Sequence, residues 1–312
     1  MIVRERPSGL RLFFVLRGSI LKQIRWVMLA NIGLAVLVTL SHGTLFHYKL
    51  QVTTIPFTLM GLPLAIFLGF RNNACYDRFW EARKLWGDIL LRCRNLSRQL
   101  LSLVAAPGPD AAAAPDERLR MIRRSLAFAL ALKHQLRGTA DSEGEVAHWL
   151  PAQEAAALVG APNPPQALML TMGQDLAACR AQGRVDSVLS ASIDATLSGL
   201  VASAAACERI KSTPLPYPYT LLLHRTAYLY CFLLPFGLVD SLGVLTPFVV
   251  ALVAYTFFGL DALGDEIEEP FGLLPNDLPL DAICRVLERD VRHALGETEL
   301  PPLRQPVDYC LM

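Results

Sequence analysis

One stretch of the chain, residues 61–86, constrains the fold more than any other. It reads GLPLAIFLGFRNNACYDRFWEARKLW. Its first ten residues carry no charge and suit a lipid bilayer, whereas Arg71 opens a run rich in Arg, Asp and Glu that suits water. No cluster of Pro or Gly separates the two halves, so the pattern predicts one helix that leaves a membrane and continues into water. Such a helix belongs to a protein in which the membrane part and the aqueous part form one body.

The composition agrees with a membrane protein. Of the 312 residues, 53% are hydrophobic and only 18% are charged, and the mean hydropathy is +0.36. Soluble domains usually carry more charge. The net charge of +1 argues against a protein that binds nucleic acid. The 7 cysteines form no C-x-x-C pair, so neither a zinc site nor a disulfide framework is indicated.

Four segments have the length and apolar character of a membrane span. A transmembrane helix needs about 20 predominantly apolar residues. The candidate spans are residues 26–46, 55–75, 217–239 and 242–262. The last two are close together in the sequence, so we expect a tight turn within residues 238–245.

Lys and Arg residues are distributed unevenly around these spans. Several precede the first span, namely Arg4, Arg6, Arg11, Arg17, Lys22 and Arg25. Only Lys49 lies between the first two spans, and residues 226–284 contain no Lys or Arg. Because short cytoplasmic loops carry the excess of positive charge, we expect both termini in the cytoplasm.

The remaining parts of the chain, residues 76–210 and 264–312, are predicted to form a cytosolic helical region. Helices are expected at residues 85–103, 121–136, 146–159, 167–180, 185–210 and 281–295. The Ala- and Pro-rich residues 105–115 predict a loop, and residues 301–312 an extended tail. No stretch alternates like a strand. The fold class is therefore an all-α membrane protein.

Three large apolar residues recur in the second span. Leu62, Ile66 and Phe70 are four residues apart, which puts them on one face of a helix with slow drift. Small residues between them would allow close approach of neighbouring helices, namely Gly61, Ala65 and Gly69. Periodicity alone favours an ordinary face packed against lipid or protein.

Acidic residues gather at the end of the fourth span. Asp261, Asp265 and Glu268 or Glu269 are spaced to share one helix face. They could form a cation site or an acidic mouth, and the alternative is a solvated or salt-bridged helix end. The 6 histidines show no ligand spacing, and no nucleophile–base motif or phosphate-binding Gly loop is present. We therefore expect no metal, no cofactor and no catalytic residues.

Motifs spread over nearly the whole chain carry a resemblance to a known family. They are IPF at 55–57, LPLAIFLGF at 62–70, EARKLW at 81–86, CERI at 207–210, EPFG at 269–272 and NDLPLD at 276–281. On these motifs the sequence resembles the bestrophin family of ion channels, and its bacterial branch in particular. The resemblance implies a homopentamer with one pore on the five-fold axis, made of four membrane helices per subunit in a bacterial inner membrane.

The resemblance also implies where the pore narrows. A hydrophobic neck lined by the second membrane helix falls on Leu62, Ile66 and Phe70. A second constriction, the cytosolic aperture, aligns with residues 183–189 and places Val188 at the narrow position. Bacterial members are associated with monovalent cations, so we expect the permeant ions to be monovalent cations. Asp77 lies further along the same helix, where the resemblance implies that it lines the cytosolic part of the pore, the vestibule.

One motif departs from the animal members of the family. They carry a run of acidic residues after the Pro-Phe-Gly stretch that binds Ca²⁺, whereas residues 273–277 here read LLPND, with Asp277 as the one acid. Tight Ca²⁺ binding needs six to eight oxygen ligands and several carboxylates. We therefore expect a channel that Ca²⁺ does not gate.

Two alternatives differ in what the protein would do. An anion channel, selective for chloride, would use the same architecture, because apolar neck residues carry no charge information. An intramembrane metal-dependent enzyme would instead use Asp261 and Asp265. That chemistry needs a second acidic cluster to hold a diphosphate through metal ions, and the sequence shows none at membrane depth.

Overall fold

The computed structural model describes two compact units of the chain. The described residues are 1–4, 9, 15, 18–42, 44–45, 48–49, 53–108, 116–141 and 144–312. The first unit, here called the hydrophobic unit, comprises residues 4–79 and 214–269. The second, the charged unit, comprises residues 1–3, 80–213 and 270–312.

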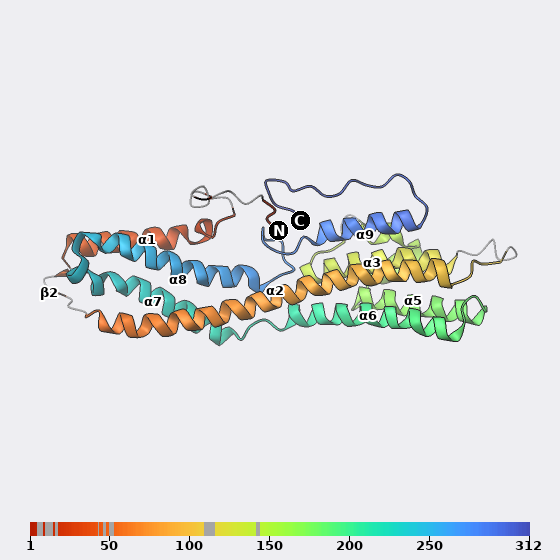
Figure 1. The fold of residues 1–312 in the computed structure, drawn as a ribbon, viewed down its shortest axis with the longest axis horizontal. Coiled ribbons are helices and arrows are strands. Elements are labelled where there is room, and N and C mark those ends of the chain that lie inside the picture. Colours follow the sequence, from red (N-terminus) through yellow and green to blue (C-terminus); the bar gives the residue numbers. More distant parts are fainter. Residues whose placement is uncertain are drawn as a thin grey trace. The chain divides into compact units, whose positions relative to one another are not determined.

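Helices build both units (Figure 1), as the all-α prediction requires. The hydrophobic unit contains α1 (Leu21–Leu40), the first part of α2 (Ile55–Leu103), α7 (Tyr217–Leu242), the 3-10 turn η4 (Gly243–Leu245) and α8 (Thr246–Glu268). The charged unit contains the rest of α2, α3 (Glu117–Arg137), η3 (Ala147–Trp149), α4 (Ala152–Val159), α5 (Pro164–Ala181), α6 (Ser187–Ser212) and α9 (Leu280–Ala294). Within the described residues, the only strands are β1 (Thr44–Leu45) and β2 (Tyr48–Lys49), which pair antiparallel.

The long helix predicted from residues 61–86 is confirmed. α2 is a single helix of 49 residues, about 74 Å long at 1.5 Å per residue. Pro63 lies inside it without ending it. Phe57, Leu64 and Leu68 form its buried face in the hydrophobic unit, where they pack into one core cluster with residues of α7 and α8.

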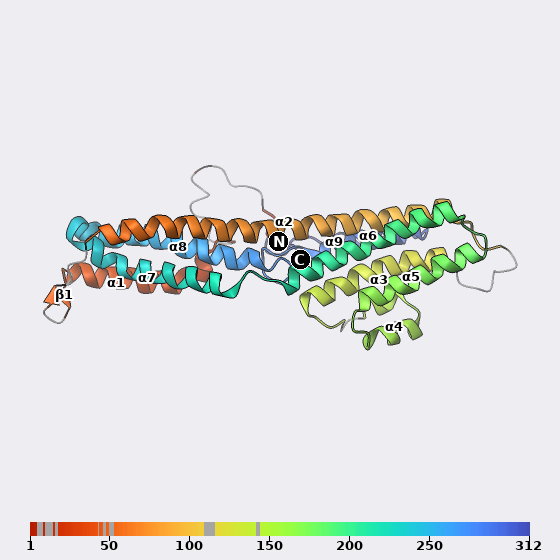
Figure 2. The ribbon, with the colours of Figure 1, turned by 90° about the horizontal axis from the view of Figure 1, so that it is seen from below.

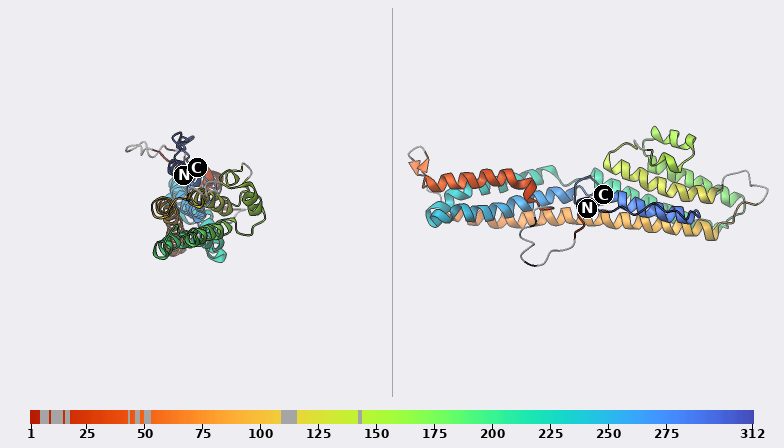
Figure 3. Two further views of the ribbon diagram at one scale, coloured as in Figure 1. Left: turned by 90° about the vertical axis from the view of Figure 1, so that its right-hand side faces the viewer. Right: turned by 90° about the horizontal axis from the view of Figure 1, so that it is seen from above.

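The hydrophobic unit is held together by α1, α7 and α8. α1 lies alongside α8 (Figure 3), and both contact α7. Pro235 inside α7 has no N–H, so the carbonyl of Cys231 loses its partner four residues later. The buried Asn31 of α1 donates to that carbonyl at 2.9 Å. The amide nitrogen of a buried polar side chain thus bonds to the carbonyl that the proline leaves without a partner, while Oδ1 of Asn31 has no partner among the described residues.

The charged unit is organised around α3. This helix is buried along most of its length and packs against α5, α6 and α9, while α4 lies beside α5 (Figure 2). Asp116 caps its first turn by accepting from the amide of Arg118 at 3.1 Å. Gly138 ends it with a φ of 66°, a left-handed conformation that glycine adopts without steric cost.

An ion-pair network joins α3 to α9. Asp281 accepts from Lys133 at 2.9 Å and from Arg137 at 2.8 Å. Glu145 also binds Lys133, at 2.5 Å. Burial by itself raises the pKa of Asp281, but the bonds from Arg137 and Lys133 outweigh it and bring that pKa below its ordinary value.

Several helix boundaries differ from those expected. The predicted helix at 146–159 is wrong, because η3 ends before Pro151 and α4 begins after it. Leu150 adopts φ −122° and ψ 152°, the extended conformation that a following proline favours. Residues 105–108 are not helical, as expected for the predicted loop at 105–115. Residues 109–115 lie outside the described residues.

The predicted spans also shift at their ends. α1 begins five residues earlier than the expected 26–46, and residue 46 lies outside the described part. α7 continues to Leu242, and α8 runs on to Glu268. The tail 301–312 contains no helix, as expected, and Leu311 donates its amide to the carbonyl of Met1 at 2.8 Å.

By length and hydropathy, four helical stretches of the described residues could cross a membrane. They are residues 21–40, 55–103, 187–212 and 217–268. The last stretch has 52 residues and comprises α7 and α8, which pack side by side and could supply two crossings. The stretch 187–212 is α6, whose residues the sequence predicts to lie outside the membrane.

Candidate functional site

The neck residues predicted from the sequence lie on an exposed face of α2. The exposed fractions of Leu62, Ile66 and Phe70 are 68%, 47% and 60%. Leu64 and Leu68, on the same helix, are buried. Residues advance by 100° around an α-helix, so the two sets occupy opposite sides of α2. We call Leu62, Ile66 and Phe70 the neck stripe.

Contacts with α7 hold this part of α2 in place. A Cβ atom on Gly61 would lie 2.8 Å from the Tyr230 hydroxyl oxygen, so the close approach of the Tyr230 ring requires glycine. Tyr230 in turn meets Phe57 edge-on, with ring centroids 6.0 Å apart. The Tyr219 hydroxyl donates to the carbonyl of Phe67 at 3.1 Å. These contacts position the neck stripe without covering it.

Arg71, the first charge after the neck stripe, turns into the protein. Its side chain is fully buried. It donates to Asp261 at 2.9 Å and also bonds to Asp265, and Glu268 lies 3.6 Å away. A buried charge must be paired, and three carboxylates of α8 do so here. Arg71 is therefore compensated by carboxylates within the same protomer.

The acidic residues of α8 are largely engaged within the protomer. Asp261 is almost fully buried and binds His224 as well, with 2.6 Å between Oδ2 and Nδ1. Glu268 accepts from the amide of Leu215 at 3.1 Å. Only the Asp265 side chain is mostly exposed, at 58%. The structure thus favours a salt-bridged helix end over an open acidic face at these positions.

The pairing of His224 with Asp261 has no signature in the sequence. The two residues are 37 positions apart, on α7 and α8, and no ligand spacing links them. From the sequence alone, His224 is one polar residue near the start of the candidate span 217–239. A buried carboxylate on one helix of a hairpin is the signal that could have suggested a polar partner on the other helix.

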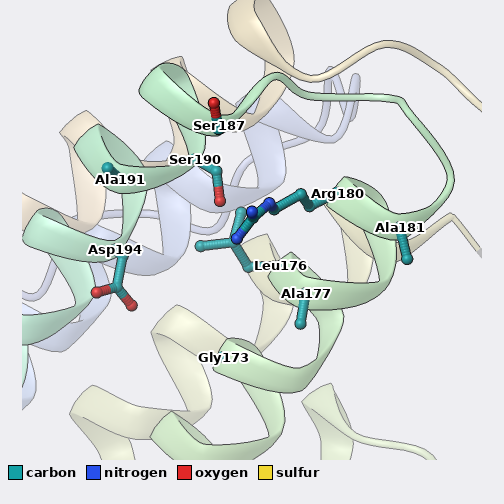
Figure 4. Close-up of a pocket in the computed structure, with 9 residues that line it drawn as sticks. All are labelled: Gly173, Leu176, Ala177, Arg180, Ala181, Ser187, Ser190, Ala191 and Asp194. Carbon is teal, nitrogen blue, oxygen red and sulfur yellow. The ribbon is translucent and has the colours of Figure 1, made fainter.

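Val188, the predicted aperture residue, lies in the first turn of α6. Its exposed fraction is 76%. Asp186 caps the helix by accepting from the amides of Val188 and Leu189 at 2.7 and 3.2 Å. Beside this turn, α5 and α6 enclose a pocket of about 560 Å³ in which Arg180 faces Ser190 (Figure 4).

The turn before Val188 is fixed to α3. Gly183 has a φ of 69°, and the amide of Arg184 reaches back to the carbonyl of Cys179 at 3.0 Å, so the end of α5 forms a Schellman turn. Arg184 binds Asp116 at 2.9 Å. Burial alone would raise the pKa of Asp116, but bonds from Arg118 and Arg184 outweigh it and lower that pKa.

The described residues offer no obvious metal centre. Among them, no group of three or more His, Cys, Asp or Glu side chains is arranged to hold a metal ion. In the loop after α8, the carboxylate of Asp277 is buried and accepts from the amide of Leu274 at 2.7 Å. This acid serves the local turn, and its neighbours in residues 273–276 supply no further carboxylate.

Known proteins resemble this chain over most of its length. A family model described as Bacterial/Fungal Bestrophin protein matches residues 1–293. The chain is 46% identical over 311 residues to the voltage-dependent anion channel-forming protein mll4386 of Mesorhizobium japonicum, which covers 99% of this chain and 96% of that relative. It is 40% identical over 301 residues to the voltage-dependent anion channel-forming protein YneE of Escherichia coli, with 96% of each chain covered.

Solved structures agree with these relatives. A crystal structure of a bacterial bestrophin homologue from Klebsiella pneumoniae, carrying one mutation, matches with a TM-score of 0.80 at 37% identity. The match covers 88% of this chain and 100% of that chain. Another structure of the Klebsiella pneumoniae homologue gives 0.79 at 36% identity, with the same coverage. Together with the family match over residues 1–293, these likenesses show that this chain belongs to the bacterial and fungal branch of the bestrophin family.

Proposed function

We propose that the protein is one subunit of a homopentameric membrane channel that passes monovalent ions. The observation that carries this proposal is the neck stripe. Three large apolar side chains stand exposed on a helix whose opposite face is buried. A single helix cannot enclose a pore, so the exposed face needs copies of itself around a closed symmetry axis. The family and the channel names of the relatives support this arrangement.

The neck would gate by wetting. Stacked rings of Leu62, Ile66 and Phe70 form a narrow apolar tube, which water and ions enter at a free-energy cost. No ion needs to bind in such a constriction for it to close. The aperture at Val188 would act in the same way as a second apolar ring. The turn before Val188 is tied to α3 through Arg184, so it would hold the Val188 ring at one position along the pore axis.

Four helices per subunit would cross the bacterial inner membrane, with both termini in the cytoplasm. These are α1, the apolar part of α2, α7 and α8. We place α6 outside the bilayer although its hydropathy would allow a crossing. Its Ser203 donates to Asp88 of α2 at 2.6 Å, in a stretch of α2 rich in charged residues. Charged side chains at membrane depth are costly, so this pair belongs in water.

We favour monovalent cations as the permeant ions. The relatives are named as anion channel-forming proteins, which makes a chloride channel of the same architecture the alternative. The acids of α8 lend little support to cations, because Arg71 and His224 compensate Asp261 within the protomer. The same contacts argue against an enzyme using Asp261 and Asp265, since an arginine occupies the place where a metal would bind. Reversal potentials under a salt gradient decide the selectivity.

The test compares two truncations on the same helix. Ile66→Ala removes an exposed side chain of the neck stripe, and Leu64→Ala removes a buried one. The purified oligomer is weighed in detergent, and ion flux is measured in liposomes. Ile66→Ala should assemble as a pentamer with larger flux. Leu64→Ala should lose about 2–5 kcal/mol of stability, as buried leucines do.

Two results would count against the pore. A stable monomer in detergent removes the symmetry on which the proposal depends. Equal flux in wild type and in the triple variant with alanine at 62, 66 and 70, both assembled, would show that the neck stripe faces lipid or a neighbouring helix instead.

A further inference from the structure

The neck stripe continues as a polar stripe on the same helix. Asn73 and Asp77 are seven and eleven residues beyond Ile66, so each lies within about 20° of it around α2. Both are exposed. Along the helix, the face that is apolar up to Phe70 therefore becomes polar with Asn73 and acidic with Asp77.

Asp77 is a free carboxylate in its surroundings. Among the described residues, its side chain makes no hydrogen bond or ion pair. The three nearest arginines on α2 are directed elsewhere. Arg71 is buried against α8, Nε of Arg78 donates to the carbonyl of Glu268 at 3.3 Å, and Arg83 lies over the Trp80 ring at 4.9 Å. An exposed acid among arginines that it does not use is available to an ion.

The position of Asp77 relative to the neck follows from helix geometry. Seven residues separate it from Phe70, which is about 10 Å along the helix axis. The acids of α8 are engaged with Arg71 and His224, so Asp77 is the first uncompensated charge on this face after the neck stripe. Glu81, four residues further on, is paired with Arg209 at 2.7 Å, and Lys84 follows seven residues after Asp77.

We infer that Asp77 is the residue that sets ion selectivity, as a ring of carboxylates at the inner end of the hydrophobic neck. This inference rests on the proposed pore, because five copies form a ring only if the neck stripe faces the axis. A ring of carboxylates in a confined tube concentrates cations and repels anions before they reach the neck. The apolar neck then controls whether ions pass, and Asp77 determines whether the permeant ions are cations or anions.

A charge series at this position tests the inference. The assembled channels Asp77→Asn, Asp77→Lys and Asp77→Glu are compared with wild type by reversal potential in a KCl gradient across a planar bilayer. The permeability ratio of K⁺ to Cl⁻ should fall several-fold in Asp77→Asn and invert in Asp77→Lys, while Asp77→Glu keeps the wild-type ratio. Asp240 is an exposed acid near the end of α7. Asp240→Asn should leave the ratio unchanged and controls for the loss of one negative charge.

Each outcome has a defined meaning. Channels that conduct with the same K⁺/Cl⁻ ratio in wild type and Asp77→Asn would overturn the inference and leave the proposed pore intact. A wild-type channel that prefers Cl⁻ would overturn it as well. Failure of Asp77→Asn to assemble would also overturn it, because a carboxylate that only faces the pore is not needed for assembly. A wild-type oligomer that conducts no ions would instead refute the proposed function.

Discussion

Replacing Arg71 by methionine should destabilise the hydrophobic unit strongly. The methionine side chain nearly fills the same space but removes the positive charge and its donors. Asp261 is then left buried beside Asp265 and Glu268 without the arginine, and His224, 2.6 Å from Asp261, remains as its hydrogen-bond partner. An uncompensated charge in a low-dielectric interior is the costly outcome of breaking a buried ion pair.

The size of the effect can be estimated from the contacts. Removing one partner of a buried ion pair typically costs about 3–5 kcal/mol. His224 still pairs with Asp261, and the Asp265 side chain is mostly exposed to solvent, so the lower end applies. The unfolding entropy is about 2.1 cal/mol/K per residue, so for a chain of 312 residues a loss of about 3 kcal/mol corresponds to a fall of about 5 °C in the melting temperature.

The matched control is an arginine whose ion pair is exposed. Arg94 binds Asp290 at 2.8 Å, and roughly half of the Arg94 side chain is in solvent. Such surface pairs contribute less than about 1 kcal/mol, so Arg94→Met should lower the melting temperature by about 1–2 °C at most. Both variants are purified in detergent, and the temperature at which each oligomer falls apart is read from size-exclusion profiles.

A double variant separates charge from packing. Asp261→Asn in the Arg71→Met background removes the stranded carboxylate, so it should recover part of the lost stability. Equal falls for Arg71→Met and Arg94→Met, or no recovery in the double variant, would refute the view that charge compensation holds α2 to α8.

Gly237→Ala should cost about 1–3 kcal/mol of stability, because a Cβ there would lie 2.2 Å from Phe57 Cε2. Gly259→Ala should be tolerated, since its Cβ comes no closer than 3.7 Å to a neighbouring side chain, and equal melting temperatures for the two would contradict this account. Asp281→Asn should lower thermal stability at pH 7. Its folded pKa is depressed, so the carboxylate stabilises the fold above the ordinary carboxyl pKa of about 3.9, and the difference from wild type should vanish as the pH falls through the folded value. Channel currents should change little between chelator and micromolar Ca²⁺, because Asp277 is the only acid in residues 273–277 and it caps the local turn; a steep rise with Ca²⁺ would disprove this.

Local patterns explain why much of the fold is predictable from the sequence. The continuity of α2 follows from an apolar segment joined to a charged one with no break between them. α5 begins at Pro164, three residues before the expected 167, and Asn163 before two prolines is the local capping signal that marks this start. The break between η3 and α4 is also a local effect, and Pro151 alone would have predicted it, because a proline disfavours the helical conformation of the residue before it.

Long-range pairing explains what the sequence does not reveal. Arg71 meets its partners 190 or more positions away, and a charge run indicates neither which arginine is buried nor which acid compensates it. The same holds for Asn31 and the carbonyl of Cys231, 200 positions apart. These contacts depend on how α1, α2, α7 and α8 pack, which local periodicity does not encode.

The placement of Arg71 also bears on the pore itself. Phe70 and Arg71 are adjacent, yet one is 60% exposed and the other is fully buried, because one residue turns the helix by 100°. A positive ring directly below the neck would repel cations. Burial against three carboxylates of α8 removes that charge from the exposed face and gives it a structural role. Arg71 therefore anchors α2 and leaves the neck stripe neutral until Asp77, so in the proposed channel anchoring and selectivity would belong to different faces of the same helix.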